Sequence, residues 1–331
     1  MALPRWGLVG AGGMARVIAR TLARLSYPVS GVHSRTFERA QALAEEFGLG
    51  RTYRSYAEML DSGEVDIVYI SATNEAHFDL ASVALEAGVV VLCEKPLTLF
   101  PAGTEQLTAL ARARNVLLVE AMWTAFLPSF LKVRDEIDSG TIGTVEFIRA
   151  DFGFRIPFAN RSRLFDPAQG GGCIYDLGPY PLLLTTAFLG PPLACHTIAR
   201  RAPSGVESHV CAMLEYAGGK VAQLLLSFEL PVCQKAIIYG CRGVIDMAEP
   251  FWRSECISLL QAKDDPPFTE SPYLGSQQRE LHRSQSDYAP QLREVVRCWQ
   301  NGLIESPYFS HTDSITLAEN MRLVRESIGL R

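Results

Sequence analysis

The stretch that decides the fold reads Arg5-Trp6-Gly7-Leu8-Val9-Gly10-Ala11-Gly12-Gly13-Met14-Ala15. Its apolar run, Trp6–Val9, predicts a buried strand. The run ends in glycines and continues as a helix, because apolar residues recur at helical spacing at Met14, Val17, Ile18, Leu22 and Leu25. Between the two elements, the three small positions of the pattern G-x-G-x-x-G/A are held by Gly10, Gly12 and Ala15.

Each small residue of this turn has a physical reason to be small. Gly10 permits the tight turn, Gly12 lets a pyrophosphate approach the backbone, and Ala15 lets the helix pack close to the strand. The free N–H groups at the helix N-terminus and the positive end of its dipole would hold the pyrophosphate. Because the motif follows a strand and precedes a helix, it predicts dinucleotide binding; a purely structural glycine turn is the alternative.

Length and composition limit the class of protein. A chain of 331 residues predicts two domains. A net charge of −5 offers no basic surface for nucleic acid, and apolar runs such as 89–93 are too short to cross a bilayer. The eight cysteines are scattered without the spacing of a metal site, so we expect reduced thiols, no bound metal and a cytoplasmic location.

The second expected strand, Val29–His33, bears on the choice of cofactor. An NAD-binding fold usually places an acid at its end, where it binds the ribose 2′-hydroxyl. Here the chain continues as Ser34-Arg35-Thr36 and offers no acid. Arg35 can make charge-assisted bonds to a 2′-phosphate, and Ser34 can add a hydroxyl. This favours NADP over NAD, unless Arg35 is merely a solvated residue at a helix start.

Three further strands, expected at 66–70, 89–93 and 116–119, alternate with helices at 38–47, 76–87 and 103–114. This alternation predicts a doubly wound parallel sheet. Ligands of such sheets lie beyond the carboxyl ends of the strands. The polar residues that follow these strands are Thr73, Asn74 and His77, then Glu94-Lys95-Pro96, then Glu120-Ala121-Met122-Trp123. Two of these residues have a purely structural alternative: His77 can be a packing histidine, and Lys95 can be a surface lysine.

The pattern changes in the second half, where long alternating runs follow one another from 143 to 261. They predict a mainly antiparallel sheet with one buried face, with Gly218-Gly219 as a hairpin turn. The uncovered face predicts a homo-oligomer, a dimer or tetramer. A loop is expected at 264–276 and helices at 287–301 and 312–328. We therefore expect a cofactor domain over 1–122 and a substrate and oligomerisation domain over 123–331, whose last helix packs back on the first domain.

One stretch of the second half, 170–181, interrupts the strand pattern. It begins with three glycines and continues as Cys173-Ile174-Tyr175-Asp176-Leu177-Gly178-Pro179-Tyr180. If it is helical, Asp176 and Tyr180 are four residues apart and lie on one helix face. A carboxylate and a phenol placed together can hold a hydroxylated substrate and relay a proton. A glycine loop followed by a packing tyrosine is the alternative.

These motifs, in this order, resemble the glucose–fructose oxidoreductase/inositol dehydrogenase (Gfo/Idh/MocA) family. The likeness runs nearly end to end, including Glu305-Ser306-Pro307, and is greatest to the branch of dimeric dihydrodiol dehydrogenases and NADP-dependent xylose dehydrogenases. It implies a Rossmann domain followed by an α+β domain with an open, mainly antiparallel sheet. It also implies hydride transfer between NADP and a carbinol or carbonyl carbon of a sugar or vicinal diol.

The resemblance assigns roles by position. Lys95 and Tyr180 match the catalytic pair, with Asp176 in support. The implied cofactor contacts are Gly10, Gly12, Gly13, Met14, Ser34, Arg35, Thr73, Asn74, His77, Glu94, Lys95 and Trp123. The chain departs from the branch at Ala125, where an arginine is typical, so the resemblance does not assign one particular substrate. A non-catalytic NADP-binding regulator on the same fold is the alternative, although retention of Lys95 and Tyr180 weighs against it.

Overall fold

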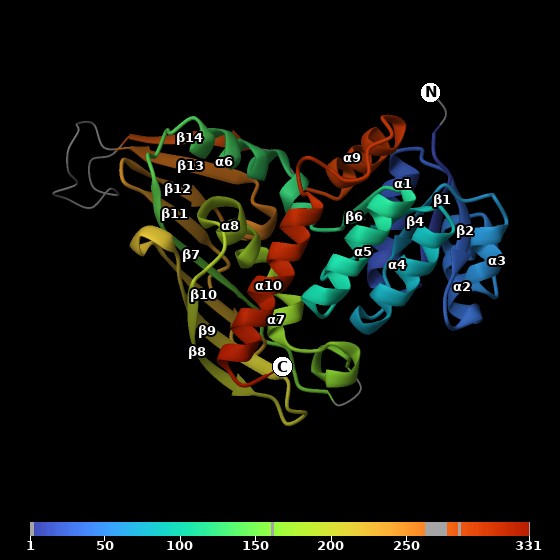
Figure 1. Ribbon diagram of the computed structural model, residues 1–331, viewed down its shortest axis with the longest axis horizontal. Helices are drawn as coiled ribbons and strands as arrows, with labels where there is room; N and C mark the ends of the chain where they lie inside the picture. Colours follow the sequence, from blue (N-terminus) through green and yellow to red (C-terminus); the bar gives the residue numbers. More distant parts are fainter. Residues whose placement is uncertain (1–2, 160–161, 262–276, 284–285, 331) are drawn as a thin grey trace. The chain divides into compact units, whose positions relative to one another are not determined.

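The computed structural model describes residues 3–159, 162–261, 277–283 and 286–330 (Figure 1). The loop expected at 264–276 lies outside these residues. The chain divides into two compact units. Unit 1 comprises Met1–Trp123 with Tyr288–Ala318, and unit 2 comprises Thr124–Asp287 with Glu319–Arg331.

Unit 1 is built on a six-stranded parallel sheet in the order β3-β2-β1-β4-β5-β6. Its strands are β1 (Trp6–Val9), β2 (Val29–His33), β3 (Arg51–Tyr53), β4 (Ile67–Ile70), β5 (Val90–Cys93) and β6 (Leu118–Glu120). Every residue of β1, β4, β5 and β6 is buried, as expected of parallel strands that are covered on both faces. The chain order reverses between β1 and β4, and this is the point where such sheets bind ligands.

Helices surround this sheet, and most begin within two residues of the predicted positions. They are α1 (Gly13–Arg24), α2 (Phe37–Phe47), α3 (Tyr56–Asp61), α4 (His77–Glu86), α5 (Pro101–Arg114) and α9 (Ala289–Gln300), with a 3₁₀ turn η1 (Asn74–Ala76). The helix α10 (His311–Ser327) contributes to both units. None of the helices within the described ranges combines the length and the apolar character needed to cross a bilayer.

Unit 2 is built on an eight-stranded mixed sheet in the order β14-β13-β12-β11-β7-β10-β9-β8. Its strands are β7 (Val145–Gly153), β8 (Ala194–Arg201), β9 (Glu207–Glu215), β10 (Val221–Ser227), β11 (Ala236–Gly240), β12 (Gly243–Met247), β13 (Cys256–Gln261) and β14 (Gln277–Arg283). Only the pair of β7 and β10 is parallel. The predicted architecture, a Rossmann sheet followed by a mainly antiparallel sheet, is confirmed.

The helices of unit 2 lie along one face of its sheet (Figure 1). They include α6 (Pro128–Asp138), which packs on β13 and β14, α7 (Cys173–Asp176), which packs on β9 and β10, and α8 (Pro179–Leu189), which packs on β7. Burial alternates accordingly along β9, where Val210, Ala212 and Leu214 are buried and Met213 is exposed. The short 3₁₀ turns are η2 (Trp123–Phe126), η3 (Arg163–Phe165), η4 (Pro167–Gln169), η5 (Ala217–Gly219) and η6 (Phe251–Arg253).

Two strands were not predicted from the sequence. β3 has only three residues, too few for a periodic pattern. β14 reads Gln-Gln-Arg-Glu-Leu-His-Arg and lacks the apolar alternation of its neighbours. It is a strand because it pairs with β13 at the sheet edge, which is a tertiary contact.

Candidate functional site

The turn between β1 and α1 has the geometry that its glycines predicted. Gly10 has φ +103°, and a Cβ there would lie 2.7 Å from the carbonyl oxygen of Ser71. Gly12 and Gly13 face open space, because apart from their chain neighbours and the adjoining backbone of α1 no atom of the described residues lies within 4 Å of the position that a Cβ would take. Gly10 is therefore required by the fold, whereas Gly12 and Gly13 leave a gap that a ligand can fill.

This gap lies at the N-terminus of α1. The first N–H groups of a helix have no partner within it, and α1 has neither a capping side chain nor an acidic residue in its first turn. Met14 is half-buried beside the exposed Gly12 and Gly13. The residues present therefore fit the pyrophosphate of a dinucleotide, which the N–H groups and the helix dipole attract.

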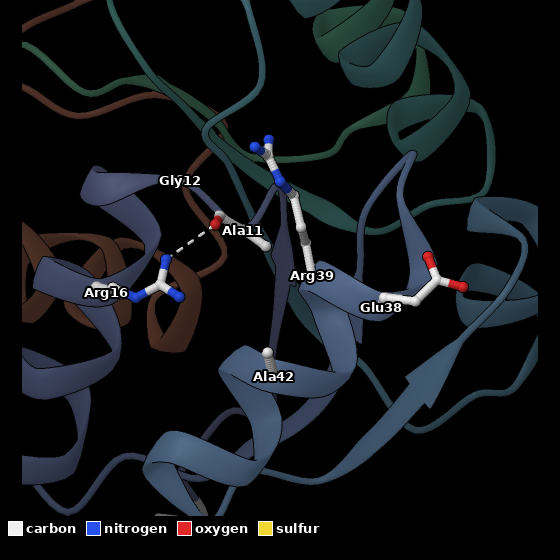
Figure 2. A pocket seen from close by; sticks show the side chains of 6 residues that line it. All are labelled: Ala11, Gly12, Arg16, Glu38, Arg39 and Ala42. Atoms are coloured by element: carbon white, nitrogen blue, oxygen red, sulfur yellow. Dashed lines mark hydrogen bonds between the residues drawn. The ribbon is translucent and has the colours of Figure 1, made fainter.

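A cavity of about 430 Å³ opens beside this turn (Figure 2). It is lined by Ala11, Gly12, Arg16, Glu38, Arg39 and Ala42. The Arg16 guanidinium braces the turn, since it donates to the carbonyl of Ala11 at 3.0 Å and pairs with Glu46 at 2.9 Å. The Arg39 side chain extends from α2 past Ala11, while the Glu38 carboxylate points to the other side, away from Ala11 (Figure 2).

Arg39 was missed by the sequence reasoning. Ser34 and Arg35 do lie in the loop between β2 and α2, where Ser34 is half-buried and Arg35 exposed. The signal in the sequence was an arginine in the first turn of the helix predicted at 38–47, four residues after Arg35. Arg39 lines the cavity beside the glycine turn, whereas Arg35 is an exposed residue of the preceding loop and does not line it.

The segment after β4 is held mainly by its own contacts. The Thr73 hydroxyl donates to Glu75 at 2.6 Å, and Asn74 is buried. His77 is fully buried, with Nδ1 2.8 Å from the carbonyl oxygen of Pro96 and Nε2 3.3 Å from that of Ala72. His77 thus connects the loops that follow β4 and β5 through its two ring nitrogens.

Lys95 follows β5 and is half-buried, and the peptide bond to Pro96 is cis. Two carboxylates hold the backbone around it. Glu94 accepts the Lys95 N–H at 3.3 Å and the Tyr69 hydroxyl at 2.5 Å. Glu120 accepts the Leu97 N–H at 2.9 Å. Lys95 is thus placed between two anchored positions of the chain.

Glu120 is a buried acid of unit 1 whose pKa is strongly shifted. Its side chain lies at the end of β6 and is almost completely buried. Burial raises the pKa of Glu120 to about 7, while hydrogen bonds from Ser314 and Leu97 and the charge of Lys95 oppose the rise. The sequence pattern predicts that the Glu120 motif follows a strand but gives Glu120 no role, because its burial depends on the packing of β6.

Trp123 and Ala125 lie in η2 and are both buried. The Trp123 ring stacks on Tyr288 with centroids 4.3 Å apart and an interplanar angle of 23°. Trp123 is therefore buried within unit 1, and its predicted contact with the cofactor stays a prediction. At Ala125 the chain provides no cation.

In unit 2, the three glycines at 170–172 form the turn before α7, and a buried carboxylate holds this turn in place. Gly172 has φ +116°, and a Cβ there would overlap the Glu207 carboxylate. Glu207 is fully buried and accepts the Ile174 N–H at 3.1 Å. Arg325 lies 3.6 Å from its other oxygen and stacks over Tyr175 at 4.3 Å. Burial raises the pKa of Glu207, although Arg325 opposes the rise.

The prediction that Asp176 and Tyr180 share one helix face is wrong. Asp176 is the last residue of α7, and Tyr180 is the second residue of α8. Pro179 lacks an N–H and cannot continue the hydrogen-bond ladder of α7, but it suits the first position of a new helix. Gly178 joins the two helices and is tightly packed against the Ile174 backbone. The structure therefore holds the two side chains on separate short elements.

Each of these two residues has a defined neighbourhood. The Asp176 carboxylate accepts a hydrogen bond from Arg163 at 3.2 Å and is 21% exposed. The half-buried Tyr180 ring lies against Phe152, with centroids 5.3 Å apart, and near Trp252 at 5.8 Å. Phe152 and Trp252 stack on each other at 5.3 Å. Tyr180 thus has an aromatic wall beside it.

The predicted residues are therefore gathered in two groups. Those assigned to the cofactor, together with Lys95, belong to unit 1, and Asp176 and Tyr180 belong to unit 2. Among the residues that the structure describes, no group of three or more histidine, cysteine or acidic side chains could hold a metal ion.

Two family models match the chain. Residues 4–122 match the oxidoreductase family with an NAD-binding Rossmann fold, and residues 130–246 match the GFO/IDH/MocA C-terminal domain. Among curated proteins, the chain is 31% identical to the trans-1,2-dihydrobenzene-1,2-diol dehydrogenase of Mus musculus and 29% identical to that of Homo sapiens. Each alignment covers 100% of this chain and 98% of the relative.

Solved structures share the fold over its whole length. A 3-ketoreductase from Actinomadura kijaniata, crystallised with NADP and TDP-benzene, aligns with a TM-score of 0.83 and 26% identity over 98% of both chains. A levoglucosan dehydrogenase aligns with a TM-score of 0.87 over 98% of this chain and 97% of its own, at 17% identity. The second match is evidence for the fold alone.

Proposed function

The chain belongs to the GFO/IDH/MocA family of oxidoreductases, and from that premise we propose that it is an NADP-dependent dehydrogenase or reductase. Its reaction transfers a hydride between the nicotinamide and a carbinol or carbonyl carbon of a diol or sugar. The observation that carries the proposal is the open glycine turn at the N-terminus of α1, together with the cavity beside it that Arg39 lines. This arrangement suits a dinucleotide that bears an additional phosphate.

NADP is favoured over NAD by the charges near β2. Arg35 and Arg39 supply guanidinium groups, and Ser34 supplies a hydroxyl, where an NAD-binding fold places an acid. Guanidinium groups bind phosphate through paired, charge-assisted hydrogen bonds. The ketoreductase that shares the fold binds NADP, which supports the same preference here.

When bound, the nicotinamide supplies or accepts the hydride. We assign the proton to the Tyr180 hydroxyl, which gives it to the substrate oxygen in reduction and accepts it in oxidation. The Lys95 ammonium stabilises the negative charge that develops on the substrate oxygen. Asp176, oriented by Arg163, accepts a hydrogen bond from a second hydroxyl of the substrate.

The surroundings of Tyr180 narrow the substrate class. The aromatic faces of Phe152 and Trp252 favour a diol on an apolar ring over a freely soluble polyol. Ala125 adds no charge where an arginine would favour a more polar substrate. The dihydrodiol dehydrogenases that the chain resembles over its full length act on a substrate of this kind, as their name states.

We also propose a cytoplasmic homodimer or homotetramer. All eight cysteines are free thiols, as expected in a reducing compartment. The face of the unit 2 sheet opposite its helices carries apolar side chains, with Ile198 79% and Met213 41% exposed, and the rings of Phe147 and Tyr239 stack at 5.5 Å. Packing this face against a second copy of the chain would bury these side chains.

The test is a turnover screen with NADP⁺ over cyclic diols and sugars, applied to the parent protein, Lys95→Met and Tyr180→Phe. We expect turnover of a diol by the parent and a loss of about 10²–10³-fold in kcat for each variant. NADP⁺ affinity should change little, because neither substitution removes a phosphate contact. Full activity of both variants would refute the catalytic assignment. Tight NADP⁺ binding without turnover across the panel would instead support the regulator.

A further inference from the structure

A cavity of about 380 Å³ in unit 2 lies outside the residues assigned above. We propose that it binds an anion carrying an aromatic or other flat apolar ring. Its volume is within the range of about 300–1,000 Å³ typical of ligand pockets. The residues that decide its chemistry are Arg155, Pro157, Phe158, Phe165, Arg201 and Phe228.

The apolar wall of this cavity is a chain of rings that runs from the core to the surface. Phe228 and Phe165 are buried, and their ring centroids lie 5.6 Å apart at a steep angle. Phe165 in turn contacts Phe158, edge to face, at 5.1 Å. Phe158 is 39% exposed although its inner edge is held by this packing. An exposed, positioned ring of this kind gains burial when a flat ligand covers it.

The charge of the cavity is positive. Arg201 donates to the carbonyl of Ile328 at 3.0 Å, and its charge acts on the buried Glu207, whose pKa it lowers, without a direct ion pair among the described residues. The acid of the cavity, Glu229, is already neutralised by Arg200 at 2.8 Å and accepts the Ser208 hydroxyl at 2.6 Å. Arg155 is exposed, and within the described ranges its guanidinium has no carboxylate partner. In a chain of net charge −5, this local excess of guanidinium groups favours an anion.

The backbone connects the cavity to the proposed proton donor. Beyond the end of β7, the chain stays hydrogen-bonded to the end of β10 and the residue after it, because Phe154 donates to the carbonyl of Ser227 at 2.9 Å and Ile156 to that of Phe228 at 2.8 Å. Phe152, which contacts Tyr180, lies four residues before Ile156, so at most roughly 14 Å of chain separates the two. The ring contact between Phe152 and Phe154, at 5.4 Å, makes this path apolar.

Two sources of such a ligand share this chemistry. One is the distal part of a long substrate whose diol lies at Tyr180, an interpretation that rests on the proposed function. The other is a separate small molecule that binds without being turned over. In both cases the ring lies against Phe158, and the negative group lies at Arg155 and Arg201.

The test uses isothermal titration calorimetry of the full chain, saturated with NADP⁺, against 1-naphthyl phosphate. Inorganic phosphate and 1-naphthol serve as ligand controls. The variants are Arg155→Gln and Phe158→Ala, and the matched control is Arg242→Gln, which removes an exposed guanidinium bonded to Gly140. We expect binding of naphthyl phosphate to weaken about 10-fold or more in Arg155→Gln and about 2–10-fold in Phe158→Ala, with Arg242→Gln unchanged.

Unchanged affinity in both cavity variants, or equal affinity for phosphate alone, would overturn the proposal, as would failure of the parent to bind naphthyl phosphate at millimolar concentration. Steady-state inhibition then identifies the source. A raised KM for the diol with constant kcat indicates the distal part of the substrate, and any other pattern indicates a separate ligand. Because binding is measured without turnover, a parent that binds the probe but turns over no diol would refute the proposed function and leave the cavity site supported.

Discussion

The turn at Gly10 and Gly12 allows the roles of two neighbouring glycines to be separated by experiment. In Gly10→Ala, the new Cβ meets the Ser71 carbonyl oxygen at 2.7 Å while the residue keeps φ +103°. A left-handed φ costs an L-residue roughly 1–2 kcal/mol, and overpacking a fitted position costs roughly 1–3 kcal/mol. We expect the free energy of unfolding to fall by about 2–5 kcal/mol.

Gly12→Ala should behave in the opposite way. Its φ of −87° suits alanine, and apart from the chain neighbours and the adjoining backbone no described atom lies within 4 Å of the new methyl group. Stability should stay within about 1 kcal/mol of the parent. The methyl group fills the gap into which the pyrophosphate fits, so NADP⁺ affinity should fall roughly 5–150-fold, the equivalent of 1–3 kcal/mol of overpacking.

The assays are differential scanning calorimetry for the melting temperature and isothermal titration calorimetry for NADP⁺. At roughly 2–4 °C per kcal/mol for a domain of 150–250 residues, Gly10→Ala should melt about 4–20 °C below the parent. Gly88→Ala is the matched control, since Gly88 has φ +76° in open space and isolates the backbone cost. If Gly10→Ala and Gly88→Ala have the same melting temperature, the predicted clash with Ser71 does not contribute to stability. If Gly12→Ala binds NADP⁺ as the parent does, the pyrophosphate does not lie at this turn.

Three further predictions concern charge and assembly. Arg35→Ala and Arg39→Ala should each weaken NADP⁺ binding about 10–100-fold while NAD⁺ binding changes little, and equal losses for both cofactors in titrations would contradict the 2′-phosphate role. The folded-state pKa of Glu120, about 7, lies above its ordinary value of 4.5, so the folded protein binds more protons between these values. The free energy of unfolding should therefore fall by up to roughly 3 kcal/mol as pH rises through this window and then stay level. In urea titrations, the free energy of unfolding of Glu120→Gln should lack that decline. If the variant and the parent have the same pH dependence, Glu120 is not the group responsible. Sedimentation equilibrium should find a dimer or tetramer that Met213→Glu dissociates; a monomeric parent at micromolar concentration would refute the sheet-face interface.

The site residues differ in how far the sequence could predict them. Gly10 and Gly12 were predictable because a strand, a turn and a helix follow one another in a few residues. Lys95 was predictable as a residue at the end of a strand. The helix through Asp176 and Tyr180 was predicted wrongly, because the spacing was weighed without the break that Pro179 imposes between them.

By itself, the sequence determined the two architectures and the glycine turn between β1 and α1. Helical and strand periods, glycine positions and polar residues at strand ends are local properties, and short-range sterics and burial encode them directly. Only the tertiary structure decided which side chains meet. Arg39 lines a cavity with Ala11, Glu120 holds the Leu97 N–H from 23 residues away, and Glu207 holds the Ile174 N–H from 33 residues away. Such pairs depend on how whole elements pack, and no periodicity within a single element records that.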